Sequence, residues 1–591
     1  LILDKTQGIP FFMEEVVQTL VEDGTLTGAP GQYQLTQHGS TQHVLTLQIP
    51  TTVQAVLAAR IDRLTPEEKA LLQQLSVIGR EFPVSVIRQV ITQPEADLYR
   101  LLASLQHKEF LYEQPAFPES EYIFKHALTQ DVAYSTVLQE QRKLLHERTG
   151  QALEAVYTST LHEHYSDLAH HYRRSAHTEK AVEYLHLAGQ QAGQRSANVE
   201  AINHLTAALE LLKTLPDTPE RSQRELTLQI ALGNSLMATK GYTAPEVEKA
   251  YTRARALCQQ IGETPQLFPV LWGLWAFYFQ RGEFQTGREL AEQFLRLAQN
   301  AQDSALLVEA HSMLGLALFV PGELAPAQAH TEQGIALYDA AKHGSLAVLY
   351  GEDPGVLCLC YGASAQCYLG YPDRALKRIE EAFTLAQELA HPHSLANALY
   401  WAAMLQQFRR EGQVAQGWAE ALLALCTEQG FSYWLAVGTI LQGWALAVQG
   451  QGEEGIAQLR QGLDAFQATG GEVSQSYFLA LLADAYGKIG QTAEGLTVLA
   501  EALATVEKTG ERFHEAELYR IKGTLTLEAR GWRLETGSPS SQAPSLKPLV
   551  SREVAREVEG YFLKAIDIAQ KQQAKSLELR AVMSLVRLRR S

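Results

Sequence analysis

The chain has 591 residues, of which 46% are hydrophobic, and this is far more than one hydrophobic core accommodates. A formal net charge of −16 argues against nucleic-acid binding through the whole surface, and no apolar run reaches the roughly 18 residues that a membrane-spanning helix needs. Five cysteines without a CxxC pair, and a start without a secretory signal, are typical of the reducing cytosol. We therefore expect a cytoplasmic protein without a membrane partner.

The first 48 residues predict one amphipathic helix and a connector. Residues 9–23 carry apolar side chains at helical spacing, and Pro10 suits a first helical turn because an N–H there has no intrahelical partner. Residues 24–48 are polar and rich in turn-forming residues, which predicts the connector. The sequence begins with Leu1 in place of a methionine, and it begins in the middle of a residue pattern. We therefore expect the chain to be the C-terminal part of a longer protein.

Residues 49–140 predict a compact module of helices and one β-hairpin. The helices are expected at 51–63, at 66–79 with Thr65 as its cap, from Pro83 onward, and at 95–107. Two short runs, 110–113 and 121–124, predict strands joined by a loop that contains prolines. Helices followed by a β-hairpin are the plan of a winged helix.

Six glycines recur at intervals of about 40 residues in the second half of the chain. They are Gly282, Gly322, Gly370, Gly412, Gly450 and Gly490, with spacings of 40, 48, 42, 38 and 40 residues. A small residue follows each glycine five positions later, so we expect a left-handed helix end at the glycine and close packing of the next helix. Such self-similarity is typical of a solenoid of stacked helical pairs.

Two classes of helical repeat compete for this pattern. The period near 40 matches the length of HEAT and armadillo repeats, whereas the register of the small residues favours tetratricopeptide repeats. The fold class we expect is mainly α, with a winged-helix module followed by a right-handed α-solenoid of tetratricopeptide-like repeats. The expected segments are the solenoid at 141–530, a disordered loop rich in Ser, Pro and Gly at 531–551, and a final repeat with the C-terminal helices at 552–591.

The start of the chain resembles a family of nucleotide-dependent switches. The run Gly8-Ile9-Pro10-Phe11-Phe12-Met13-Glu14-Glu15 is similar to the GxP motif of signal-transduction ATPases with numerous domains, the STAND class. Residues 49–54, 122–134 and 350–356 resemble bacterial proteins that join a class III adenylate or guanylate cyclase domain to an AAA-like ATPase and a tetratricopeptide tail. The resemblance implies that residues 1–48 end an ATPase helical domain and that the repeats are a sensor arm.

The same resemblance implies nucleotide chemistry only in a longer parent protein. The chain has no GxxxxGK[ST] stretch, so we expect no catalytic residue, no enzyme activity and no cofactor bound by this chain alone. ATP or ADP with magnesium would be held by an upstream nucleotide-binding domain, which is one expected partner.

Three residues of this chain would contact that nucleotide, as the resemblance implies. Gly8 and Pro10 would pack against the adenine, and His126 would reach the β-phosphate of ADP. Structural alternatives remain open: a helix entrance for Gly8 and Pro10, and a capping or core histidine for His126. The motif around His126 also departs from the family, because Ala127 replaces an aspartate.

Other polar groups predict structure rather than chemistry. His164, His170 and His171 with Asp167 and Glu163 have the composition of a metal cluster. Residues 163, 167, 170 and 171 lie near one helix face, however, which favours packing between repeats over a metal site. The helix at 95–107 offers few basic side chains for phosphate contact, which argues against nucleic acid as a partner. We therefore predict no metal and no nucleic acid.

Aromatic residues crowd two neighbouring repeats and indicate a partner surface. Trp401, Trp418, Tyr433 and Trp434 would line a groove for a protein or peptide effector, although aromatic residues at helical spacing are more often part of a core. The functional hypothesis is a regulatory and protein-interaction arm of a signal-transduction ATPase that is linked to a cyclase. The alternatives are a stand-alone tetratricopeptide scaffold for protein assembly and the arm of a transcriptional regulator.

Overall fold

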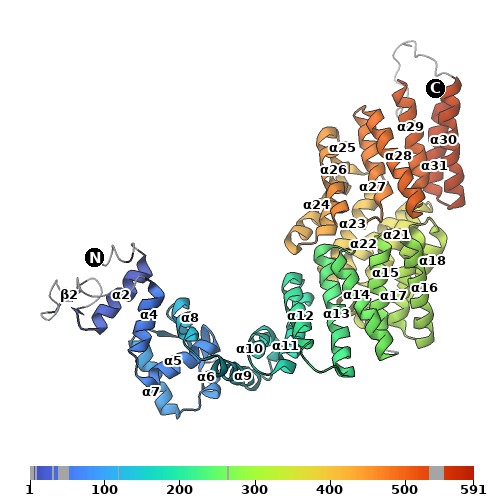
Figure 1. Ribbon diagram of the computed structural model, residues 1–591. Helices are drawn as coiled ribbons and strands as arrows, with labels where there is room; N and C mark the ends of the chain where they lie inside the picture. Colours follow the sequence, from blue (N-terminus) through green and yellow to red (C-terminus); the bar gives the residue numbers. More distant parts are fainter. Residues whose placement is uncertain are drawn as a thin grey trace. The chain divides into compact units, whose positions relative to one another are not determined.

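The computed structural model describes residues 6, 9–28, 32–36, 52–116, 119–262, 265–531 and 552–590 (Figure 1). No helix within these ranges is long and apolar enough to cross a bilayer. Gly8 lies outside the described residues. The predicted loop at 531–551 also lies outside them, except for its first residue. The chain divides into two compact units: unit 1 is Leu1–Ala188 with Glu210–Leu215, and unit 2 is Gly189–Leu209 with Pro216–Ser591.

Unit 1 contains short helices and two small antiparallel sheets. Its helices include α2 (Pro10–Glu22), α4 (Val53–Asp62), α5 (Pro66–Ile78), α6 (Val84–Val90), α7 (Glu95–His107), α8 (Ala127–Ser135), α9 (Gln139–Val156) and α10 (Tyr165–Arg174). One sheet pairs β1 (Leu26–Thr27) with β2 (Gln34–Leu35), and the other has the order β3-β5-β4, from β3 (Glu81–Pro83), β4 (Leu111–Gln114) and β5 (Glu121–Phe124). The predicted helices and hairpin are present in the predicted order, and the unit extends past residue 140.

One strand of this sheet was missed by the sequence analysis. Residues 81–83, where we expected only a helix start, form β3, and Phe82 pairs with Tyr122 of β5. Three residues are too few to show an alternating pattern, and Pro83 ends the strand because it has no N–H for the ladder. The buried Phe82 ring meets Phe124 edge-on at 5.8 Å, so this short strand contributes to the core.

The predicted cap at the start of α5 is confirmed. The Thr65 hydroxyl accepts a hydrogen bond from the Glu68 N–H at 3.3 Å, and the Glu68 carboxylate accepts one from the Thr65 N–H at 2.9 Å. Burial alone would raise the pKa of Glu68, but hydrogen bonds from Lys108 and Ser104 of the neighbouring segment help to lower it to about 2. Glu68 therefore both caps α5 and ties it to α7.

Unit 2 is a stack of antiparallel helical pairs. The pairs are α13 (Pro219–Lys240) with α14 (Pro245–Ile261), α15 (Leu267–Gln280) with α16 (Phe284–Ala301), α17 (Ser304–Phe319) with α18 (Leu324–Leu337), α21 (Pro354–Tyr368) with α22 (Pro372–Glu388), α23 (Pro392–Phe408) with α24 (Gly412–Gln429), α25 (Ser432–Val448) with α26 (Gly452–Ala468), α27 (Gln475–Lys488) with α28 (Thr492–Thr509), and α29 (Glu515–Ala529) with α30 (Arg552–Lys571), followed by α31 (Lys575–Arg590). Two short helices, α19 (Ala340–His343) and α20 (Leu346–Tyr350), are inserted between α18 and α21. Residues of α11 (Thr178–Gln194) and α12 (Asn198–Leu212) belong to both units. This stack confirms the predicted α-solenoid of tetratricopeptide-like repeats.

The two helices of a pair differ in burial, and we call them inner and outer. All 15 residues of the inner helix α21 are buried, whereas the outer helix α22 buries only one face. That face is made of Ala375, Ile379, Ala382 and Ala386, at the spacing of an amphipathic helix. Ala375 and Ala382 are the small residues five and twelve positions after Gly370, so the predicted close packing occurs there.

Five of the six ladder glycines have the predicted left-handed conformation. Their φ angles lie between 77° and 102°, at Gly282, Gly322, Gly370, Gly450 and Gly490. The prediction for Gly412 is wrong, because Gly412 is the first residue of α24 and Arg410 takes the left-handed conformation with φ of 66°. The Arg410 side chain makes an ion pair of 2.6 Å with Asp484.

A second series of left-handed residues follows the outer helices, and the sequence analysis missed it. The series consists of Gly262, Gln302, Ala390, Gly430, Gly470, Gly510 and Gln573. Since three of these residues are not glycine, the series leaves no regular composition signal in the sequence.

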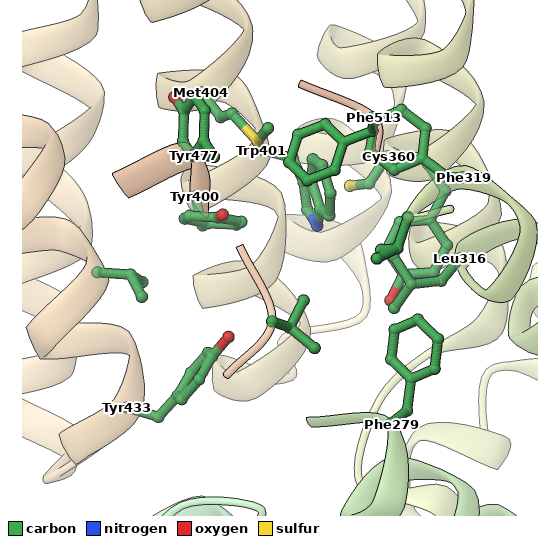
Figure 2. Packing of buried hydrophobic residues seen from close by; sticks show 14 of the residues in the cluster. Phe279, Leu316, Phe319, Cys360, Tyr400, Trp401, Met404, Tyr433, Tyr477 and Phe513 are labelled. Atoms are coloured by element: carbon green, nitrogen blue, oxygen red, sulfur yellow. The ribbon is translucent and has the colours of Figure 1, made fainter. Parts of the chain in front are cut away.

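Successive turns of the solenoid touch each other along its axis. The N–H of Glu472 donates to the Gln280 carbonyl at 2.7 Å, and the N–H of Arg512 donates to the Val320 carbonyl at 2.9 Å; both pairs are 192 residues apart. Figure 2 shows side chains from distant repeats packed together in this region, among them Phe279, Phe319, Trp401, Tyr477 and Phe513. The interior is therefore a hydrophobic core, where the sequence analysis expected a curved groove.

Gly470 and Gly510 give a matched test of these contacts between turns. Both are left-handed, but a Cβ on Gly470 would lie 2.7 Å from Thr243 Oγ1, whereas nothing lies within 4 Å of one on Gly510. We expect either alanine to cost about 1 kcal/mol of backbone strain. Gly470→Ala should cost roughly 1 kcal/mol more, because it disturbs the hydrogen bond from Thr243 to Thr469. Chemical denaturation of the full chain measures both, and equal losses would contradict the expectation.

Candidate functional site

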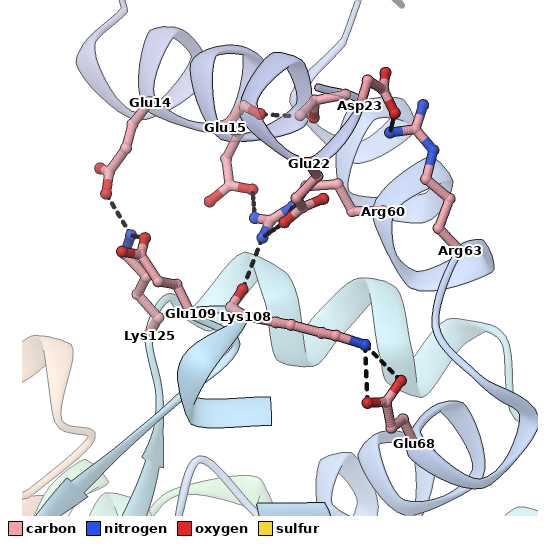
Figure 3. A network of polar contacts seen from close by, with 11 residues as sticks. Glu14, Glu15, Glu22, Asp23, Arg60, Arg63, Glu68, Lys108, Glu109 and Lys125 are labelled. Carbon is pink, nitrogen blue, oxygen red and sulfur yellow. Dashed lines mark hydrogen bonds and ion pairs between the residues drawn. The ribbon is translucent and has the colours of Figure 1, made fainter. Parts of the chain in front are cut away.

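The predicted GxP helix, α2, is held against the rest of unit 1 by a buried arginine (Figure 3). Arg60 of α4 pairs with Glu15 and, at 2.6 Å, with Glu22, and it donates to the Lys108 carbonyl at 2.8 Å. Its guanidinium also lies 4.7 Å from the centre of the Phe110 ring. Arg60 and Glu15 are at most 2% exposed, so each neutralises the other away from water.

Lys125 makes a second attachment to α2, directly before His126. Its ammonium group pairs with Glu14 of α2 and, at 2.7 Å, with Glu109 (Figure 3). Burial alone would lower the pKa of Lys125, but the two carboxylates outweigh it and raise the pKa above its usual value. The backbone at His126 is therefore held close to α2.

His126 lies beside the GxP motif, although 115 residues separate it from Phe11. The centroids of the Phe11 and His126 rings are 3.8 Å apart, with the rings tilted by 44°. His126 is the N-cap residue of α8, and its Nε2 is buried without a hydrogen-bond partner among the described residues. Pro10, the first residue of α2, is exposed next to Phe11. The structure therefore places His126 against Phe11, the residue that follows Pro10 in the GxP motif.

The histidines of α9 and α10 form a buried hydrogen-bonded group. His146 Nδ1 lies 3.0 Å from His171 Nδ1, and His146 Nε2 lies 2.9 Å from the Tyr134 hydroxyl. Burial lowers the pKa of His146 to about 3 and that of His171 well below its usual value, so both rings are neutral near pH 7. Within the described ranges no three His, Cys, Asp or Glu side chains are arranged so that they could hold a metal ion. Packing is therefore the interpretation that the structure favours for this histidine-rich segment.

Most of the aromatic residues predicted to line a partner groove lie in the core of unit 2. Trp401, Tyr433 and Trp434 are 4–7% exposed, and the Trp434 indole donates to His393 Nε2 at 3.0 Å. Trp418 is half-buried and packs against the edge of the same core. The core alternative therefore accounts for the first three side chains, and only Trp418 retains a partly exposed surface.

A cavity of about 480 Å³ lies within unit 2, and the sequence analysis did not anticipate it. Its walls come from the C-terminal part of α11, from α12, α13 and α15, from the inserted α20, and from the segments around His391 and Phe431. This volume lies within the range of small-molecule sites, roughly 300–1,000 Å³. The 48-residue spacing in the glycine ladder was the signal that could have pointed to it, because the inserted residues form one wall.

A buried polar network lies at the end of this insertion. Glu352 accepts a hydrogen bond from the Tyr242 hydroxyl and lies 3.3 Å from His393 Nδ1. Asp353, the N-cap residue of α21, accepts a hydrogen bond from the Tyr338 hydroxyl at 2.9 Å. Burial raises the pKa of Asp353 to about 6. The two acidic residues of the 350–356 run therefore anchor the insertion to its surroundings.

Comparison with known sequences gives a short family match and a longer relative. The family model described as anaphase-promoting complex subunit 5 matches residues 357–409. An uncharacterized protein of Rhizobium meliloti (strain 1021) is 24% identical over 535 residues, which cover 88% of this chain and 50% of that protein. The chain therefore spans about half the length of this relative.

Comparison with solved structures gives distant likenesses. A Rap protein complexed with competence and sporulation factor is 12% identical, covers 59% of this chain and 99% of its own, and has a TM-score of 0.40. A STAND protein with a tetratricopeptide repeat sensor from Pyrococcus horikoshii is 11% identical, with coverage of 97% and 71% and a TM-score of 0.33. The Cut9–Hcn1 hetero-tetramer of the APC/C is 11% identical, with coverage of 82% and 88% and a TM-score of 0.34. Likenesses this distant carry no argument about function.

Proposed function

We propose that this chain is the regulatory, protein-binding arm of a signal-transduction ATPase. The repeats of unit 2 bind an effector, and unit 1 contacts the nucleotide-binding domain of a longer parent that holds ATP or ADP with magnesium. The observation that carries the proposal is the Phe11–His126 cluster. The His126 ring lies against Phe11 of the GxP helix, and its buried Nε2 has no hydrogen-bond partner among the described residues. A cyclase as the output of the parent rests on the resemblance of the sequence runs alone.

His126 has a position that suits a phosphate sensor. As the N-cap residue of α8 it lies beside the free N–H groups of the first turn, where the helix dipole favours an anion. In the parent, His126 would turn from Phe11 and donate through Nε2 to the β-phosphate, while Pro10 packs against the adenine. Because Ala127 replaces the aspartate of the related motif, His126 would act without that partner.

Effector binding would act through a difference in affinity between two states of the parent. An effector that binds the open state more tightly shifts the population toward it. The contacts of Pro10 and His126 with ADP are then lost, and ADP leaves. Unit 1 supplies the contacts and unit 2 the effector site in this scheme.

The test uses the longer protein in which a nucleotide-binding domain precedes this chain. We expect His126→Ala to speed ADP release by about 10- to 100-fold, because a hydrogen bond to a charged group contributes roughly 1.5–3 kcal/mol. Release of a fluorescent ADP analogue measures the rate. His107→Ala, a change at an exposed histidine on α7, is the matched control and should leave the rate unchanged.

An unchanged ADP release rate in His126→Ala would remove the sensor role of that residue. The stand-alone scaffold for protein assembly would then be the better description of the repeats, since it needs no coupling to a nucleotide. Effector capture by unit 2 without any change in nucleotide exchange is the result that this alternative predicts.

A further inference from the structure

The cavity in unit 2 depends on an insertion that the other described repeats do not have. Sixteen residues, 338–353, separate α18 from α21, whereas only residues 430 and 431 separate α24 from α25. The inserted segment supplies the cavity wall from Ser345 to Gly351, through its helix α20. The irregular spacing in the glycine ladder is therefore the origin of a concave surface.

This wall is fixed to the first complete repeat of the stack. Asn234 of α13 donates a hydrogen bond to the Leu349 carbonyl at 2.8 Å and accepts one from the Tyr251 hydroxyl at 2.6 Å. Tyr350 is fully buried against Trp272 of α15, with 6.0 Å between the ring centroids. The cavity is therefore preformed, with little freedom in its inserted wall.

The insertion also buries acidic side chains, which is energetically unfavourable and which a short turn would avoid. Glu352 and Asp353 are 5% and 0% exposed, and burying a carboxylate is unfavourable unless its partners compensate for the lost water. The Tyr350 hydroxyl, also buried, has no hydrogen-bond partner among the described residues. Departures of this kind from ordinary packing are typical of functional sites.

The chemistry of the lining is neutral and amphipathic. Among the described residues that line the cavity there is no lysine, arginine, aspartate or glutamate. Burial lowers the pKa of His391 to about 4, so this lining histidine is uncharged near pH 7. The other lining histidine, His393, lies 3.3 Å from the Glu352 carboxylate, which offsets a positive charge there. Gln194 and Asn198 offer amide donors and acceptors, whereas Ala231 and Leu349 offer apolar surface.

We propose that this cavity binds an uncharged small molecule that carries amide or hydroxyl groups on an apolar body. A charged ligand would lose its hydration without gaining a counter-charge from the lining. An amphipathic neutral ligand matches both the amide groups and the apolar wall. The inference deepens the sensor half of the proposed function and does not involve the nucleotide contacts of unit 1.

The first measurement compares two probes of the same body whose terminal groups differ, a neutral amide in one and a carboxylate in the other. N-acetyl-tryptophanamide is neutral and joins amide groups to an apolar indole, and N-acetyl-tryptophan has the same body with a carboxylate. Titrations followed by saturation-transfer NMR on the full chain should give a Kd for the neutral probe at least about 10-fold below that of the anion. Equal affinities, or no saturation transfer to the neutral probe, would overturn the proposal.

A cavity-filling variant locates the binding. Ala231→Phe places a ring on the half-buried wall of α13 and should reduce affinity for the neutral probe by at least about 10-fold. Ala493→Phe, at an exposed position of α28 that does not line the cavity, is the matched control and should have no effect. Equal affinities in the two variants would place the probe elsewhere and overturn the proposal.

A charge introduced at the rim keeps the test valid if Ala231→Phe fails to fold. Val348 lines the cavity and is 48% exposed, so Val348→Lys adds a cation without disturbing the core. We expect it to narrow the preference for the neutral probe from about 10-fold to about 3-fold or less. An unchanged preference would overturn the proposal.

The probe titrations and the His126→Ala experiment test different parts of the chain. The titrations can fail while the His126→Ala experiment succeeds, so the two proposals can be overturned separately.

Discussion

Glu517→Gln should lower the free energy of unfolding of unit 2 by about 3–5 kcal/mol, because it removes the acid of a buried ionic group. Glu517 of α29 is 2% exposed, and its Oε1 lies 2.9 Å from Arg520, 3.3 Å from Arg410 and 3.4 Å from Arg580. These arginines come from α29, from the turn after α23 and from α31. Replacing the carboxylate by an amide leaves three positive charges around a neutral group, of which, within the described ranges, only that of Arg410 keeps a carboxylate partner, Asp484.

The pH dependence of this variant gives a second readout. Burial alone would raise the pKa of Glu517, but the arginines outweigh it and hold the pKa well below 4.5, its usual value. Because the folded pKa is depressed, the contribution of Glu517 is complete above the unfolded pKa and is lost as the pH falls through the folded one. The difference between the wild type and Glu517→Gln should therefore be largest near pH 7 and should shrink in acid.

The measurement is urea unfolding of the full chain, followed by circular dichroism at pH 7 and at acid pH. Glu507→Gln is the matched control, since Glu507 is 71% exposed and lies 3.8 Å from Arg512. Such a surface pair contributes at most about 1 kcal/mol. A loss as small in Glu517→Gln as in Glu507→Gln would show that the ionic group does not hold α31 to the earlier repeats.

Arg60→Ala should destabilise unit 1 by about 3–5 kcal/mol, because it leaves Glu15 buried without its counter-charge. The side chain of Glu15 is 2% exposed, and the Lys108 carbonyl also loses a donor. The loss should appear first where α2 meets α4. Hydrogen exchange measured by mass spectrometry should show faster exchange in the peptides 10–22 and 53–62.

Two further variants separate the charge from the packing. Arg63→Ala removes a pair with Asp23 whose members are 45% and 28% exposed, so its cost should stay below about 1 kcal/mol. Arg60→Met combined with Glu15→Leu replaces the buried pair by apolar side chains and should recover much of the loss. If the double variant is as unstable as Arg60→Ala, the hydrogen bond to Lys108 matters more than the unpaired charge.

The local signals in the sequence predicted the elements well. Thr65 and Pro66 marked the start of α5, and the glycine ladder marked the ends of the inner helices, because capping depends on neighbouring residues only. The prediction for Gly412 was wrong because Arg410, two positions earlier, takes the left-handed conformation, and Gly412 still fits the spacing of the glycine ladder. The candidate nucleotide contacts came from a resemblance, and the proximity of Phe11 to His126 required the fold.

Features that depend on distant parts of the chain could not be predicted. The aromatic residues of α23 and α25 gave no sign that distant segments would cover them. Trp401 packs edge-on against Phe319, and Tyr433 packs edge-on against Tyr242, and both partners lie in much earlier parts of the chain. The cavity was hidden for the same reason, since its walls join α11 to residue 431. Burial of the acidic pair Glu352 and Asp353 also contradicts what residue type alone suggests.

Contact between successive turns has a consequence for how this arm can evolve. In an array in which each repeat touches only its neighbours, one repeat can be duplicated or deleted with little effect on the others. Here Gln280 and Glu472 are bonded to each other across several repeats. The loss of one repeat between them would place a residue about 40 positions further along the chain, the length of one repeat, opposite Gln280. Every later contact of this kind would shift in the same way. We therefore expect changes in the number of repeats to be restricted, and variation between relatives to concentrate in insertions such as 338–353.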